Sequence, residues 1–138
     1  MKDRGSGTVE AMIAVPAIIL VLLLGMAAGR ITVAMAAIEA AARDASRQAS
    51  IARTAPAARA AALASATASM RSRGLNCRSV SVDVDTTGFG RPVGSAAIVT
   101  ANVSCAVSLA DLGFPGLPGD VVKNSQFTSP LDTYRGRR

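Results

Sequence analysis

An uncharged apolar run near the N-terminus constrains this chain more than any other feature of its sequence. Residues 11–29 contain no Asp, Glu, Lys or Arg over 19 positions. At a helical rise of about 1.5 Å per residue, they would nearly cross the roughly 30 Å hydrocarbon core of a bilayer. A water-soluble amphipathic helix would carry polar residues every three or four positions. The run therefore predicts a single membrane-spanning helix, and Pro16 within it predicts a kink.

The composition of the 138-residue chain limits its other functions. Lys and Arg number 15 against 9 Asp and Glu, a net charge of +6, but aromatic residues make up only 3% and Trp is absent. The basic residues therefore lack the stacking partners of nucleic-acid-binding sites, and we attribute the positive charge to contact with anionic lipid headgroups or to solubility. The chain has no His, no phosphate-binding loop and no nucleophile beside a base. We expect no catalytic residue, metal, cofactor or nucleic-acid partner, and a structural rather than an enzymatic role.

The residues that flank the apolar run are compatible with two kinds of processing. A secretory signal peptide also joins a basic start to an apolar run, and residues 34–36 (Ala-Met-Ala) offer a cleavage site. This run is long for a signal peptide, however, and Glu10 stands at its head. In the other kind, Gly5 is followed by Ser6, with Glu10 five residues past the glycine. This junction resembles the site that prepilin peptidases cut in type IV pilin-like proteins, and we favour it.

The resemblance at this junction implies cleavage after Gly5 and a role for Glu10 in assembly. Cleavage would create on Ser6 an α-amino group with a pKa near about 8, which is positive at neutral pH. A carboxylate one helical turn into apolar surroundings is costly unless it is paired. Glu10 of one subunit would therefore compensate the amine of a neighbour. The alternative is that Glu10 only favours the positive end of the helix dipole, which contributes about 0.3–1 kcal/mol.

The orientation of the span is not set by charge. Lys2 and Arg4 precede the apolar run, and Arg30, Arg43 and Arg47 follow it, so a count of positive residues is ambiguous. We expect the N-terminus in the cytoplasm because of the cleavage motif and because both cysteines follow the run.

Residues 30–73 are rich in alanine and in other strong helix formers. They predict that the membrane helix continues as one long rod, loosened near Pro56. Glu39 and Arg43 are spaced i,i+4, while Asp44 and Arg47 are spaced i,i+3, and both spacings predict a small stabilisation of the helix. The alanines would permit close helix–helix approach, but a general alanine bias explains them as well.

A glycine and a change of periodicity predict a β module after the helix. Gly74 fits the position just after a helix C-terminus. Residues 79–85 and 97–107 alternate with valines on one face, and the loop between them is rich in Gly and Pro. We expect an antiparallel hairpin, an irregular loop over 113–119 and a short third strand within 121–130. The tail, 131–138, ends with basic residues and is predicted to be mobile.

The only two cysteines, Cys77 and Cys105, suit one disulfide in an oxidising compartment, with two reduced buried thiols as the alternative. The bond would contribute about 3–4 kcal/mol in the chain-entropy model. A register that places the cysteines opposite each other differs by one residue from the register that pairs Val84 with Val99. We therefore expect a bulge or a strand end near Cys77.

Several of these pieces, in this order, resemble the TadE-like proteins, the minor pilins or pseudopilins of tight-adherence (Flp-type) pili. They are residues 4–11 (Arg-Gly-Ser-Gly-Thr-Val-Glu-Ala), Pro16, residues 41–47 (Ala-Ala-Arg-Asp-Ala-Ser-Arg), the hairpin with its cysteines, and residues 130–135 (Pro-Leu-Asp-Thr-Tyr-Arg). The resemblance implies a membrane protein that a prepilin peptidase cuts between Gly5 and Ser6 and that enters or initiates a fibre. It makes Glu10 the assembly carboxylate. The major pilin of such systems is usually much shorter, which favours a minor one.

The sequence as a whole predicts an α+β fold. We expect a leader peptide at 1–5, a transmembrane helix at 6–29, an Ala-rich helical extension at 30–73 and an extracytoplasmic β module with a basic tail at 74–138. The expected partners are the membrane, other pilin or pseudopilin subunits, the prepilin peptidase and the pilus assembly platform. The expected location is the cell membrane, and a surface pilus after assembly. The alternative is a membrane-anchored or secreted binding module for an unknown partner.

Overall fold

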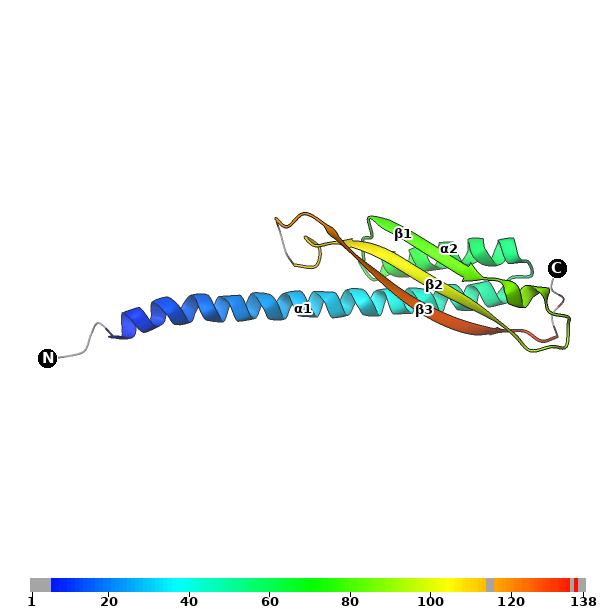
Figure 1. Cartoon of the computed structure of the whole chain (residues 1–138), viewed down its shortest axis with the longest axis horizontal. Coiled ribbons are helices and arrows are strands. Elements are labelled where there is room, and N and C mark those ends of the chain that lie inside the picture. Colours follow the sequence, from blue (N-terminus) through cyan, green and yellow to red (C-terminus); the bar gives the residue numbers. More distant parts are fainter. Residues whose placement is uncertain (1–5, 114–115, 135, 137–138) are drawn as a thin grey trace.

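The fold is α+β, as expected, with a long N-terminal helix and a small antiparallel sheet. The structure, a computed structural model, describes residues 6–113, 116–134 and 136. The elements are, in chain order, α1 (Ser6–Ile51), α2 (Ala55–Ser72), β1 (Ser79–Asp85), the 3₁₀ helix η1 (Thr87–Gly90), β2 (Ala97–Ser108) and β3 (Asp120–Leu131). The N-terminal part of α1 projects alone from a module that the other elements form around its C-terminal part (Figure 1).

Helix α1 is continuous over 46 residues and is helical through Pro16. Alanine, which has the highest helix propensity, is the commonest residue in its sequence. At about 1.5 Å per residue it is about 69 Å long. From Glu10 onward, where the side chains are described, the first buried one is that of Ala27, and buried residues recur from Ala34 onward. One helix thus serves both as the projecting element and as part of the core.

The prediction of a single rod over residues 30–73 is wrong beyond Ile51, because the chain turns at residues 52–54 and α2 runs back along α1 (Figure 1). Thr54 caps α2, since its hydroxyl accepts a hydrogen bond of 3.3 Å from the backbone N–H of Ala57. Pro56 lies in the first turn of α2, where its missing N–H needs no partner within the helix. Pro56 therefore helps to begin a helix and does not loosen one.

Alanine forms most of the contact between the helices and the rest of the core. The buried residues of α2 recur every fourth position, at Ala58, Ala62, Ala66 and Met70. Four alanines of α1 are fully buried: Ala41, Ala42, Ala45 and Ala49. Side chains this small let helices approach closely. In this chain the alanine-rich composition therefore builds a core.

Two hydrogen bonds between side chains join α1 to its neighbours. The Ser69 hydroxyl on α2 donates a hydrogen bond of 2.7 Å to Asp44 Oδ2. The hydroxyls of Ser46 and Ser129 are 2.9 Å apart and join α1 to β3 inside the core. Both pairs satisfy polar groups that would otherwise be costly to bury.

Helix α2 ends at Gly74, as predicted. Gly74 has a positive φ of 72°. The N–H of Leu75 bonds to the carbonyl of Met70 at 3.0 Å, and the N–H of Gly74 bonds to that of Arg71 at 3.0 Å. This pair of bonds is the Schellman motif, in which a left-handed glycine closes the last turn of a helix.

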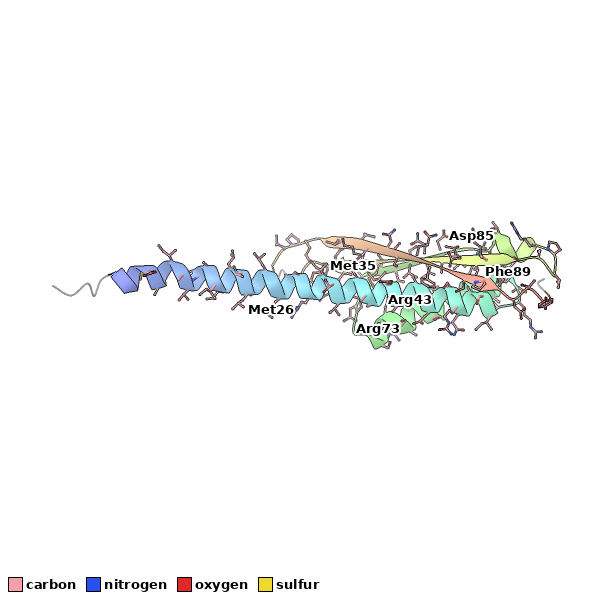
Figure 2. The ribbon with its side chains drawn as sticks, turned by 90° about the horizontal axis from the view of Figure 1, so that it is seen from below. Met26, Met35, Arg43, Arg73, Asp85 and Phe89 are labelled. Carbon is pink, nitrogen blue, oxygen red and sulfur yellow. A yellow bond between two sulfur atoms is a disulfide. The ribbon has the colours of Figure 1, made fainter. Side chains whose placement is uncertain are left out.

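The sheet has the order β1-β2-β3 with antiparallel neighbours, and it packs with one face on the layer formed by α1 and α2 (Figure 2). The inward face of β2 is the centre of the core, and it consists of Val99, Ala101, Val103, Cys105 and Val107. The expected valine face of the hairpin is thus confirmed. The third strand is also confirmed, although at 12 residues β3 is not short.

Neither register expected for the hairpin is correct. Val84 lies opposite Ala101 and not opposite Val99, while Val80, and not Cys77, lies opposite Cys105. The connection between the two strands contains the 3₁₀ helix η1 in addition to the expected Gly- and Pro-rich loop, so it is not the simple turn on which both expected registers were centred. The expectation of a strand end near Cys77 is confirmed, because β1 begins at Ser79.

The β module also contains the Gly- and Pro-rich loop between β2 and β3 and the C-terminal tail after β3. No helix or strand occurs in the described part of the Gly- and Pro-rich loop, where Gly113, Gly116 and Gly119 have positive φ. Tyr134 is 88% exposed near the C-terminus. The tail predicted to be mobile, residues 131–138, begins at the last residue of β3, and its Arg135, Arg137 and Arg138 lie outside the described residues.

Candidate functional site

The projecting part of α1 exposes a large apolar surface. Residues 10–26 are all exposed, and Met12 and Ile13 expose 76% and 71% of their surface. Within the described residues, one helix is long and apolar enough to cross a membrane, with a mean hydropathy of 2.7 and 6% burial in its most apolar window. A soluble monomer rarely leaves so large an apolar surface in water. The helix therefore suggests single-pass membrane anchoring.

Glu10 lies at the start of this exposed stretch. No described residue forms an ion pair with Glu10, and its side chain is exposed. Within lipid, a carboxylate in this position needs a partner. None of the described elements supplies one, so the role assigned to Glu10 stays a prediction that depends on groups outside them.

The structure tests the other N-terminal positions less directly. Gly5 lies outside the described residues. Ser6 is the first residue of α1, and the structure describes its backbone only. Pro16 lacks the N–H that would bond to the carbonyl of Met12, but the helix continues through it. Cleavage between Gly5 and Ser6 and a kink at Pro16 both stay predictions.

The two cysteines form the expected disulfide. Cys77, five residues after the end of α2, is bonded to Cys105 in the C-terminal part of β2, with 5.5 Å between their Cα atoms. Cys105 is fully buried, and Cys77 Sγ lies 3.6 Å from Met70 Sδ. The bond therefore ties the end of α2 to the middle strand. It lies in the module, whereas Glu10 and Pro16 lie in the N-terminal part of α1.

Charged residues on the module-bound part of α1 form one of the two predicted pairs. Glu39 and Arg43 form an ion pair of 3.2 Å, and the guanidinium of Arg43 lies 5.8 Å from the ring centroid of Phe127. The predicted Asp44–Arg47 pair is absent among the described residues, because Asp44 accepts its hydrogen bond from Ser69 instead. Tertiary packing on α2 has thus replaced a local helix contact.

A groove at the junction of helix and module is a feature that the sequence did not predict. It has a volume of about 550 Å³ and is lined by α1 from Met26 to Ala37, by the turn after α2, and by Val107 of β2 with the loop that follows this strand. The loop after β2 closes on α1 nearby, where a side chain on Gly113 would come within 3.4 Å of Ala27 Cα. Because three distant segments form the groove, no local pattern could have predicted it.

The described residues contain no cluster of three or more His, Cys, Asp or Glu that could hold a metal ion. The geometry instead defines a class of protein: a small disulfide-linked α+β module on a single apolar helix that is suited to a membrane.

Residues 5–47 match the model of a protein family described as TadE-like protein. The resemblance expected from the sequence is therefore confirmed over this stretch, which contains Glu10, Pro16 and most of α1. The rest of the chain, including α2 and the sheet, lies outside the match. No curated protein and no solved structure matches the chain. The similarity to TadE-like proteins suggests a protein associated with the tight-adherence pilus, in which a structural role is expected.

Proposed function

We propose that this chain is a minor pilin or pseudopilin of a tight-adherence pilus system, anchored in the membrane by α1. The observation that carries the proposal is the exposed apolar half of α1, which lies within the segment that matches TadE-like proteins. A bilayer covers this surface before assembly, and neighbouring subunits cover it in a fibre. The same helix serves both states because it needs only apolar contacts along its sides.

Processing by a prepilin peptidase between Gly5 and Ser6 prepares the chain for assembly. The cut leaves a positive amine on Ser6, and Glu10 of an adjacent subunit neutralises it in an apolar environment where either charge alone is costly. The support for this step is the junction motif at the start of the family match, together with a Glu10 that has no partner among the described residues.

The module that follows α1 lies on the extracytoplasmic side. Support comes from the disulfide between Cys77 and Cys105, because such bonds persist in oxidising compartments and are rare in the cytosol. The N-terminus then lies in the cytoplasm. The assembly platform and other subunits are the partners in this scheme.

The test is the N-terminal sequence and intact mass of the protein isolated from membranes of its own host, with and without the prepilin peptidase. We expect a mature chain that begins at Ser6 and that is lost when the peptidase is absent. Glu10→Ala should be processed but fail to enter fibres, whereas Glu39→Ala, which removes another exposed glutamate of α1, should assemble normally. A chain that begins near Ile38, or an uncut Met1, would overturn pilin-type maturation and favour a secreted or anchored binding module.

A further inference from the structure

The groove between α1 and the module begins at the surface that we assign to the membrane. Its α1 wall includes Met26, Gly29 and Val33, and both Met26 and Val33 are more than 60% exposed. Met26 and Gly29 belong to the uncharged run, while Val33 lies one turn beyond it. The groove therefore starts at the depth of the lipid chains and extends outward, past the end of the apolar run. Figure 2 shows Met26 on the projecting part of α1 and Arg73 at the end of α2.

The polar lining of the groove is mainly positive. Arg30 and Arg73 line it together with a single carboxylate, that of Asp111. Within the part of the chain that the structure describes, neither arginine forms an ion pair or a side-chain hydrogen bond. Arg30 directly follows the apolar run, which is the depth of the lipid headgroups if residues 11–29 span the bilayer. A complementary occupant is therefore apolar at one end and anionic at the other.

We propose that the groove binds one anionic phospholipid of the outer leaflet. An acyl chain lies along Met26 and Gly29, and the headgroup phosphate lies beyond them, between Arg30 and Arg73. A guanidinium suits this task because its planar donors match phosphate oxygens. The inference rests on the proposed membrane anchoring and adds a ligand to it.

A helix from a second copy is a poorer fit to the groove. The exposed apolar part of α1 has only Glu10 to offer two arginines, whereas a lipid phosphate lies beside its own acyl chains.

The experiment uses the full chain in nanodiscs of equal parts phosphatidylglycerol and phosphatidylcholine. Native mass spectrometry counts the lipid molecules that stay bound to the protein when it is released from the nanodisc. We expect one retained lipid, with a strong preference for phosphatidylglycerol. The double variant Arg30→Gln/Arg73→Gln should lower this preference about thirtyfold, equal to about 2 kcal/mol, since each arginine near an anionic surface contributes about 1 kcal/mol. The double variant Arg47→Gln/Arg53→Gln removes the same charge from exposed positions that do not line the groove, and it should keep the preference.

A second pair of variants tests the apolar half of the groove. A Cβ atom on Gly29 would meet no heavy atom within 4 Å, and Gly29 lines the groove, so Gly29→Leu should place its side chain in the groove and reduce lipid retention. Gly25→Leu is the matched control, because Gly25 is equally open but does not line the groove. Both changes favour the helix, so neither should unfold the protein.

Three results would overturn the inference. They are equal retention of the two lipids by the unaltered protein, equal losses in test and control variants, and loss of self-association without loss of lipid in Gly29→Leu. The last result would assign the groove to a second copy. The proposed membrane anchoring is tested separately, by fractionation of host cells. A protein that is not found in the membrane fraction would contradict the anchoring itself, whatever lipid it retains.

Discussion

Ser69 on α2 donates a hydrogen bond of 2.7 Å to the Asp44 carboxylate on α1, and both side chains are half-buried between the two helices. The pair closes the α-helical hairpin that the turn at residues 52–54 begins. It also explains why Asp44 does not bind Arg47 on its own helix.

Ser69→Ala should therefore lower the free energy of unfolding. A hydrogen bond to a charged group contributes about 1.5–3 kcal/mol, and Asp44 would lose its partner in a half-buried position. The measurement is urea unfolding of the full chain in detergent. Ser72→Ala on the same helix is the control, and we expect a change within about 0.5 kcal/mol because Ser72 is exposed. Equal effects in the two variants would show that the Asp44 contact adds nothing.

Ala62→Leu should destabilise the protein because α2 has no room for a larger side chain at this position. Ala62 is fully buried, and overpacking a close interface costs about 1–3 kcal/mol. The same substitution at the exposed Ala64 serves as control and should be neutral. Thermal unfolding of both variants measures the difference. If Ala62→Leu has the same midpoint of thermal unfolding as the control variant, close contact between the helices does not depend on alanine at this position.

Gly88→Ala should destabilise the hairpin connection for a different reason. A Cβ atom on Gly88 would collide with the carbonyl oxygen of Ile98, which is backbone and cannot rotate away. We expect a loss of about 1–3 kcal/mol. Gly90→Ala is the control in the same 3₁₀ helix, where a Cβ meets nothing within 4 Å. A loss confined to Gly90→Ala, or shared equally by both variants, would contradict the steric explanation.

Reduction of the Cys77–Cys105 bond should lower the free energy of unfolding by about 3–4 kcal/mol, because the bond closes a loop between residues 28 positions apart. The unfolding midpoint with and without a thiol reductant gives the value. The double variant Cys77→Ala/Cys105→Ala should be insensitive to the reductant. A midpoint that does not move in the unaltered protein would show that the bond is absent or without effect on stability.

Asp85 should make the stability depend on acid pH. The backbone N–H of Thr87 donates a hydrogen bond of 2.9 Å to Asp85 Oδ1, and this bond and the one from the Thr87 hydroxyl hold the pKa of Asp85 below 3.8. Because the pKa of Asp85 is lower in the folded than in the unfolded chain, where it is about 3.9, ionised Asp85 stabilises the fold above that pH. This contribution to the free energy of unfolding is lost as the pH falls through the folded pKa. Asp85→Asn should flatten the pH dependence below about pH 4. An NMR titration midpoint for Asp85 at or above 3.8 would contradict this.

Local signals predicted much of the fold correctly. The uncharged run predicted the apolar helix, Gly74 predicted the end of α2, and alternating valines predicted the hairpin. Thr54 and Pro56 also form a local signal, that of a helix start, and this signal is missing from the prediction of a loosened rod. The hairpin register required knowledge of η1, a turn with no hydrophobic pattern of its own. The groove required the tertiary arrangement of three segments, and no local pattern encodes such an arrangement.

The continuity of α1 has a geometric consequence for the whole molecule. One unbroken helix passes from the apolar run into the core. The rotation of the apolar part about the helix axis therefore fixes the direction in which the sheet faces. Each residue of a helix turns the chain by about 100°, so one residue inserted between Met26 and Ala27 would turn the module by that angle relative to the apolar part. Torque or tension applied to the module would be transmitted to the apolar part of the chain through one helix that is continuous from Ser6 to Ile51.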